Sequence, residues 1–152
     1  WGAYTGLVPV EVARSVGIDG SILNHSERRI SDSDIERALE RMKALNMLSL
    51  VCAETLEEGA KFAAMGADFI AIEVPELIGG DVSVSSARPE LIAEAVSKIG
   101  AGKVIVGAVI KTGDDVRKAI SLGAAGVLVS SGIVKAADQI GILREMCAAL
   151  KS

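Results

Sequence analysis

The sequence predicts an α/β fold in which strands and helices alternate around a parallel sheet. Short apolar runs rich in Val, Ile and Leu alternate with longer amphipathic runs, which is the pattern of consecutive βα units. Half of the 152 residues are apolar but only 3% are aromatic, a composition that suits strands buried on both faces. The length is that of one ordinary domain, so residues 1–152 are expected to form a single domain.

Five segments are predicted to be strands because each is short and rich in Leu or β-branched side chains. They are residues 20–23, 48–53, 68–72, 104–108 and 126–129.

Start and stop signals predict a helix after each strand. Three pairs resemble N-terminal capping boxes: Ser31 with Asp34, Thr55 with Glu58, and Thr112 with Asp115. Pro89 suits a first helical position, and the glycines at 66, 100 and 123 suit helix ends. One further helix, at about residues 9–16, precedes the first strand, and a last one, at about residues 140–150, closes the chain.

Five such units fit either an open doubly wound sheet or the later part of an eight-stranded barrel. Ionisable groups after two strands, His25 and Glu73, favour the barrel, whose functional groups sit at the carboxyl ends of its strands. Five strands cannot close an eight-stranded barrel, because strand number, tilt and shear are linked. We therefore expect either an incomplete gene product or a partial barrel that covers its open edges by self-association.

Charge and hydropathy disfavour several classes of partner. The formal net charge is −4 and the isoelectric point is about 5.1, with no basic stripe for nucleic acid. No apolar run approaches the ~18 residues of a membrane span, and no signal segment is visible. Cys52 and Cys147 form no disulfide framework, which is typical of a reduced, cytoplasmic protein.

The chain's only histidine, His25, follows the first predicted strand. A lone histidine is more often a surface or core residue than a reactive one. Here a second predicted strand ends on Glu73 and runs into a loop rich in Pro and Gly. Two strand ends that present an imidazole and a carboxylate form an acid–base pair typical of an active site.

Two successive loops in the second half indicate a phosphate site. The strand at 104–108 leads through small residues to the helix capped by Thr112, and the strand at 126–129 ends in Ser130 and Ser131. Small side chains let backbone N–H groups approach an anion, and a helix start adds a favourable dipole. The alternative is that these residues only make tight turns.

Four motifs occur in the order found in the triosephosphate isomerase family and resemble its short, archaeal-type branch over essentially the whole chain. They are GAYTG at 2–6, NHSERR at 24–29, VCAE at 51–54 and EVPELIG at 73–79. The chain has no counterpart to the family's first three strands, which bear a substrate-anchoring lysine. Val74 replaces a proline usual in the family, and Val109 replaces a glycine of this branch.

The resemblance implies interconversion of dihydroxyacetone phosphate and glyceraldehyde 3-phosphate, with no cofactor and no metal. It makes His25 the neutral electrophile and Glu73 the proton-transferring base. It also implies a homodimer, in which Thr5 enters the neighbouring subunit's site. The residues implied to bind the phosphate are Ile78, Gly79, Val109, Ser130 and Ser131, and those implied to support His25 are Asn24, Ser26 and Glu27. Cys52 is implied to be buried behind the site.

Two alternatives to an active isomerase follow from the same residues. One is a non-catalytic, self-associating half-barrel that retains phosphate binding. The other is a different phosphate-binding barrel enzyme, such as an aldolase, which is disfavoured because no predicted strand ends on a Schiff-base lysine.

Overall fold

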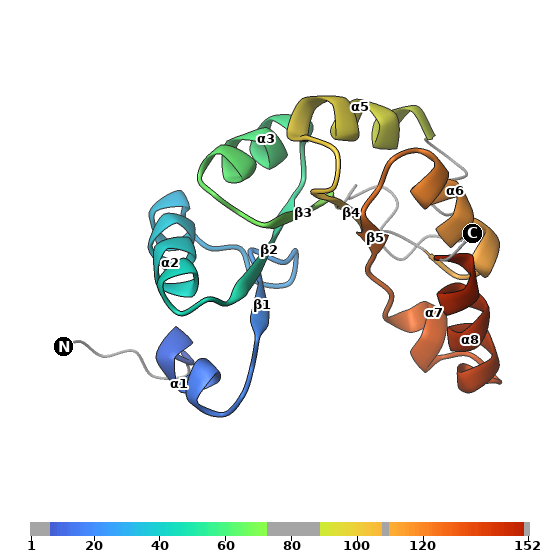
Figure 1. Ribbon diagram of the computed structural model, residues 1–152, viewed down its shortest axis with the longest axis horizontal. Helices are drawn as coiled ribbons and strands as arrows, with labels where there is room; N and C mark the ends of the chain where they lie inside the picture. The colour runs from blue at the N-terminus through green and yellow to red at the C-terminus, as the bar shows by residue number, and fades with distance from the viewer. Residues whose placement is uncertain (1–6, 73–88, 108–109, 151–152) are drawn as a thin grey trace.

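The computed structural model describes residues 7–72, 89–107 and 110–150. Five parallel strands form one sheet in the order β1-β2-β3-β4-β5, so each strand pairs with its neighbours in sequence. The sheet is curved, and helices α2, α3, α5 and α6 lie along its convex side (Figure 1). This is the expected series of βα units in an incomplete barrel, and the prediction of the fold class is confirmed.

The strands lie where the sequence predicts them, with three shortened. Their bounds are β1 Gly20–Leu23, β2 Leu48–Ala53, β3 Phe69–Ile72, β4 Val104–Val106 and β5 Gly126–Val127. Strand β3 begins one residue late because the Asp68 N–H donates to Ser49 Oγ (3.0 Å) instead of to a strand carbonyl. Strand β5 ends two residues early, although Leu128 N still donates to Val106 O at 2.9 Å.

The helices also follow the predicted start signals. Their bounds are α1 Val10–Ser15, α2 Asp32–Ala44, α3 Leu56–Ala64, α5 Pro89–Ile99, α6 Gly113–Ser121, α7 Ser131–Val134 and α8 Gln139–Ala149. Ser31 and Thr55 accept hydrogen bonds from the N–H groups of Asp34 and Glu58, at 3.2 and 3.1 Å. Of the three predicted capping boxes, the one of Thr112 and Asp115 is complete in both directions.

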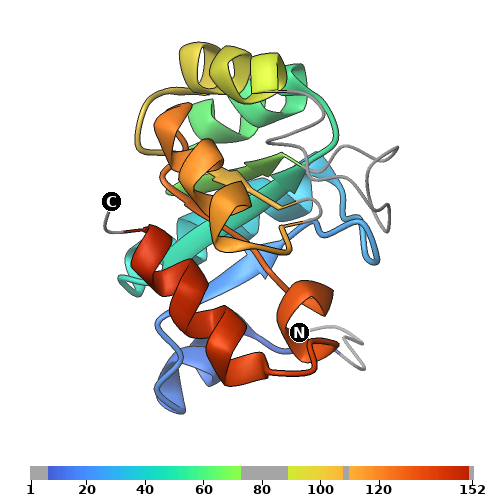
Figure 2. The ribbon, with the colours of Figure 1, turned by 90° about the vertical axis from the view of Figure 1, so that its right-hand side faces the viewer.

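The ends of the helices and the last two helices of the chain also bear on the sequence prediction. The glycines after α3, α5 and α6 have positive φ, as expected for helix ends. The short helix α7 is not predicted by the sequence pattern. Helix α8 packs against α6 and α7 at the far end of the sheet (Figure 2). None of the helices in the described residues is long and apolar enough to cross a membrane.

The two faces of the sheet differ in what covers them. The main core lies between the strands and the helices, around fully buried Val51, Ile70 and Phe62. The opposite, concave face has a smaller apolar cluster of Cys52, Ala71 and Ile105, with Leu50, Phe69 and Leu128 packed beside it. Towards the β1 edge, Ile22 and Leu48 are about half exposed, at 49% and 56%.

Candidate active site

The loop after β1 presents His25 at the carboxyl end of the sheet. Strand β1 ends at Leu23, and Asn24 turns the chain with a φ of 58°. The His25 carbonyl accepts a hydrogen bond from Arg28 N at 2.8 Å, which closes a turn. The His25 side chain is 44% exposed, so the loop leaves its ring accessible to a ligand.

The same turn fixes which nitrogen of the imidazole holds the proton. The Glu27 N–H donates to His25 Nδ1 at 3.3 Å, which requires a lone pair on Nδ1. The Glu27 carboxylate lies 3.9 Å from Nδ1, too far to compete as a hydrogen-bond acceptor. The neutral ring therefore carries its proton on Nε2, where it can donate to a carbonyl oxygen.

Asn24 anchors this loop to the neighbouring strand. It is 7% exposed, and its Nδ2 donates to the Cys52 carbonyl of β2 at 3.0 Å. Its Oδ1 accepts from Ile30 N, also at 3.0 Å. The hydrogen bonds of the Asn24 side chain satisfy its buried amide group, as a buried polar side chain requires. They also hold the start of the loop to β2 and to the end of the loop at Ile30. Ser26 and Glu27 lie exposed on the loop between these ends.

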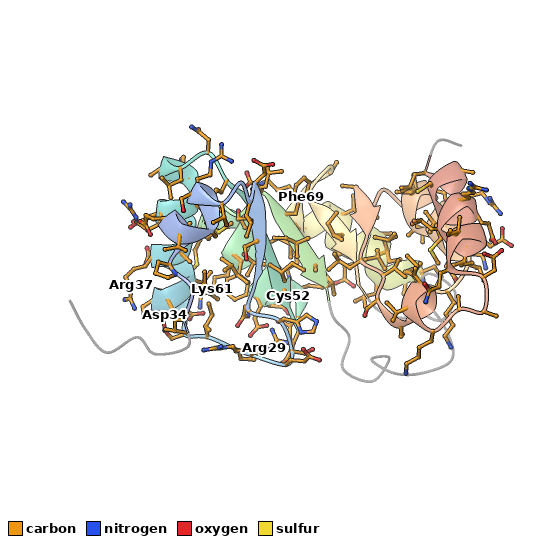
Figure 3. All side chains as sticks on the ribbon, turned by 90° about the horizontal axis from the view of Figure 1, so that it is seen from below. Arg29, Asp34, Arg37, Cys52, Lys61 and Phe69 are labelled. Carbon is orange, nitrogen blue, oxygen red and sulfur yellow. The ribbon has the colours of Figure 1, made fainter. Side chains whose placement is uncertain are left out.

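Arg29 and Glu54 also join the loop to the end of β2, a contact that the sequence pattern does not predict. Arg29 Nη1 donates to the carbonyls of Asn24 at 3.0 Å and of Cys52 at 3.4 Å. Its Nη2 lies 2.7 Å from Glu54 Oε1, just beyond the end of β2. The contact is an ion pair without hydrogen-bond alignment, because Nε and Nη2 make no hydrogen bond within the described residues. Figure 3 shows Arg29 at this end of the sheet.

The loops after β4 and β5 meet each other. An added Cβ at Gly132 would lie 2.3 Å from the Ile110 carbonyl oxygen, so only glycine permits this approach. Ser130 precedes α7 and Ser131 is its first residue, and both are exposed. The two loops expected to bind phosphate are therefore adjacent, and the two serines after β5 are exposed.

Four expected site residues, Glu73, Ile78, Gly79 and Val109, lie outside the described residues. Strand β3, which precedes Glu73, ends at Ile72 opposite Ala53, while Leu23 at the end of β1 lies opposite Val51. Strands β1 and β3 flank β2, so their carboxyl ends lie at the same edge of the sheet. The prediction that His25 and Glu73 act together stays a prediction.

No group of three or more His, Cys, Asp or Glu side chains could hold a metal ion within residues 7–72, 89–107 and 110–150. Cys52 is fully buried on the concave face and Cys147 is exposed, and neither takes part in a disulfide.

Comparison with known proteins identifies the family. Residues 1–147 match the family model described as triosephosphate isomerase. The chain belongs to the triosephosphate isomerase family. It is 45% identical over 148 residues to the triosephosphate isomerase of Thermoplasma volcanium, covering 96% of this chain and 70% of that protein. It is 47% identical over 139 residues to that of Methanothermobacter thermautotrophicus, covering 89% and 61%. The recognition of an archaeal-type member of the family is confirmed.

Solved structures support the fold over the same extent. Thiamine phosphate pyrophosphorylase from Pyrococcus furiosus superposes with a TM-score of 0.69 at 22% identity, covering 94% of this chain and 64% of that one. A 3-hexulose-6-phosphate synthase gives 0.69 at 20% identity, covering 91% and 65%. At these identities the likeness concerns the arrangement of βα units. The chain spans about three fifths to seven tenths of the length of the proteins it matches.

Proposed function

We propose that this chain interconverts dihydroxyacetone phosphate and glyceraldehyde 3-phosphate, with His25 as the electrophile and Glu73 as the base. The observation that supports this most directly is the Glu27 N–H bond to His25 Nδ1, which leaves the proton of the neutral ring on Nε2. Membership of the triosephosphate isomerase family supplies the reaction class, whose known chemistry pairs a carboxylate base with a neutral histidine.

The reaction needs only proton transfers. Glu73 removes a proton from the hydroxymethyl carbon, and the electron pair of that C–H bond forms the C–C double bond of an enediolate. His25 Nε2–H donates to the ketone oxygen as negative charge develops there. Return of the proton to the former ketone carbon, with transfer of the hydroxyl proton between the two oxygens, gives the aldehyde. A neutral imidazole suits this role because it donates a hydrogen bond without introducing a full charge.

The phosphate of the substrate would lie where the loops after β4 and β5 meet. The close approach of Gly132 to the Ile110 carbonyl brings the two loops together, and exposed Ser130 and Ser131 stand at that junction. Ile78, Gly79 and Val109 are proposed to complete this site. No cofactor or metal takes part in the proposed reaction.

A coupled assay on the purified 152-residue chain tests the activity. The chain should be produced in a host that lacks its own triosephosphate isomerase, and His25→Ala and Glu73→Ala should be purified in parallel. Turnover that either substitution lowers by about a thousandfold or more supports the proposal. Turnover equal in all three preparations, or no faster than in buffer, refutes it.

The second candidate is a non-catalytic half-barrel that self-associates and binds phosphate. Half-exposed Ile22 and Leu48 on the concave face favour association, because exposed apolar surface at a sheet edge tends to pair with another chain. We propose a cytoplasmic homodimer in either case. A monomeric mass by light scattering would contradict the dimer. Amide shifts at Ser130 and Ser131 on adding inorganic phosphate, without turnover, would favour the half-barrel.

A further inference from the structure

Two hydrogen bonds tie the loop that bears His25 to the end of β2, and a third holds the loop together. Asn24 Nδ2 and Arg29 Nη1 both donate to the Cys52 carbonyl, at 3.0 and 3.4 Å. Arg29 Nη1 also holds the Asn24 carbonyl, which belongs to the peptide group that joins Asn24 to His25. The orientation of that peptide group therefore depends on where the Arg29 guanidinium sits.

Glu54, just beyond the end of β2, determines the position of the Arg29 guanidinium. Its Oε1 lies 2.7 Å from Arg29 Nη2, and the two side chains are 47% and 29% exposed. The Glu54 backbone is fixed in turn, because its N–H donates to Glu58 Oε2 in the first turn of α3 at 2.9 Å. The Glu54 carboxylate, held just before α3, thus orients the Arg29 guanidinium towards the carbonyls of Asn24 and Cys52.

We propose that Arg29 and Glu54 are positioning residues that hold the Nε2–H tautomer of His25. The guanidinium fixes the Asn24–His25 peptide, this peptide sets the start of the turn, and the turn places the Glu27 N–H against His25 Nδ1. When this support is lost, the Glu27 N–H no longer occupies Nδ1 and the proton redistributes between the two ring nitrogens. Neither residue touches the substrate in this scheme.

The contacts of Arg29 require a guanidinium group and not only a positive charge. One planar guanidinium places Nη1 against two carbonyls and Nη2 against a carboxylate in a fixed geometry. A lysine would keep the positive charge but has a single nitrogen on a flexible stem. Arg29→Lys therefore separates charge from geometry, while Glu54→Gln removes the charge and keeps the shape of the side chain.

The single histidine makes the test direct. In chain labelled with ¹⁵N-histidine, the imidazole spectrum reports only His25 and distinguishes the two neutral tautomers. We expect the wild type to show the Nε2–H form at a pH where the ring is neutral. We expect Arg29→Lys and Glu54→Gln each to give a mixture, with amide exchange at Ile30 about tenfold faster because its acceptor Asn24 loosens.

A matched ion pair provides the control. Glu11 is 50% exposed and pairs with Arg41, whose Nε donates to Glu11 Oε1 at 2.8 Å, joining α1 to α2 outside the His25 loop. Glu11→Gln and Arg41→Lys should leave the His25 spectrum and Ile30 exchange as in wild type. The proposal is wrong if the site variants keep a pure Nε2–H spectrum, or if the control variants change it equally.

The kinetic readout rests on the proposed function, whereas the spectrum does not. If the chain is active, Glu54→Gln should lower kcat by about tenfold with KM changed less than about twofold, because the donor is displaced and substrate contacts persist. A KM effect without a kcat effect would contradict positioning. If the chain is inactive the proposed function fails, but the tautomer measurement still decides the role of Arg29 and Glu54. If Arg29→Lys does not fold, the half-exposed Glu54→Gln decides it alone.

Discussion

Asp68 binds Ser49 through three hydrogen bonds at the amino ends of β2 and β3. Ser49 N and Oγ both donate to Asp68 Oδ2 at 2.8 Å, and Asp68 N donates to Ser49 Oγ at 3.0 Å. Ser49 is 2% exposed. The pair lies one step before the register pair Leu50–Phe69, so it aligns the two strands at the end of the sheet opposite to His25.

Replacing this serine should weaken the whole sheet. Ser49→Ala removes the hydroxyl from both a donor and an acceptor role in a buried place, and we expect the free energy of unfolding to fall by about 1–3 kcal/mol. Urea denaturation measures the change. Ser121→Ala is the control: its exposed hydroxyl bonds only the Lys118 carbonyl, so a change within about 0.5 kcal/mol is expected.

Substitution of two asparagines with similar backbone angles can distinguish the energetic cost of a left-handed backbone from that of a lost hydrogen bond. Asn24 and Asn46 have φ values of 58° and 52°, but only Asn24 is buried. Asn46→Ala should cost about 1–2 kcal/mol for the left-handed backbone alone. Asn24→Ala should cost about 2–5 kcal/mol, because Ile30 N also loses its acceptor. Equal costs in thermal or urea unfolding would show that the Asn24 amide contributes nothing.

The junction of the loops after β4 and β5 depends on Gly132. In Gly132→Ala the new Cβ meets a backbone oxygen, which cannot move aside, so we expect a loss of about 1–3 kcal/mol in stability. Weaker amide shifts at Ser130 and Ser131 with inorganic phosphate should accompany it. Gly126→Ala is the comparison, since its Cβ would meet only the Ile105 Cδ1 atom, at 3.2 Å, and should be tolerated.

Acid should remove the contribution of Asp34 to stability. The hydrogen bond from Ser31 Oγ, with the nearby charge of Arg37, lowers the pKa of Asp34 below its ordinary 3.8. A lowered folded-state pKa stabilises the protein above the unfolded pKa, and this contribution disappears as pH falls through the folded value. The difference in stability between wild type and Asp34→Asn should therefore be constant from pH 7 to about 5 and shrink below 3.8. A constant difference down to pH 2 in urea titrations would contradict this origin.

The two thiols should differ in reactivity. Cys147 is exposed and Cys52 is fully buried, so a thiol reagent should modify one cysteine rapidly in the native chain and both in denaturant. Mass spectrometry after digestion identifies the site. Rapid native labelling of Cys52 would mean that the concave face opens.

Local signals in the sequence predict most of the fold. Ser31, Thr55 and Thr112 mark helix starts because each cap depends on residues only three positions away. Helix α7 escapes prediction because its four residues begin without a side-chain cap and have too few turns for periodicity.

The candidate site is predicted in composition rather than in arrangement. The motif around His25 indicates which residues form the loop, yet Asn24 and Arg29 of this loop are held by Cys52 in β2 and by Glu54 just beyond it. Charges of opposite sign after two neighbouring strands are the signal that could have revealed the Arg29–Glu54 pair. Arg29 and Glu54 are 25 positions apart in the sequence, and the parallel register of β1 and β2 brings them into contact. Local sequence patterns do not predict this contact, because the register depends on how the strands pair in the folded protein.

The strand order has a consequence for how the chain forms. Every pair in the sheet joins consecutive strands, so no strand has to be inserted between two others. Closing each pair requires only the crossover between two consecutive strands, which keeps the loop entropy of each step small. The sheet can therefore grow from either edge, one βα unit at a time. A unit added before β1 would extend an existing edge without rearranging what is already folded.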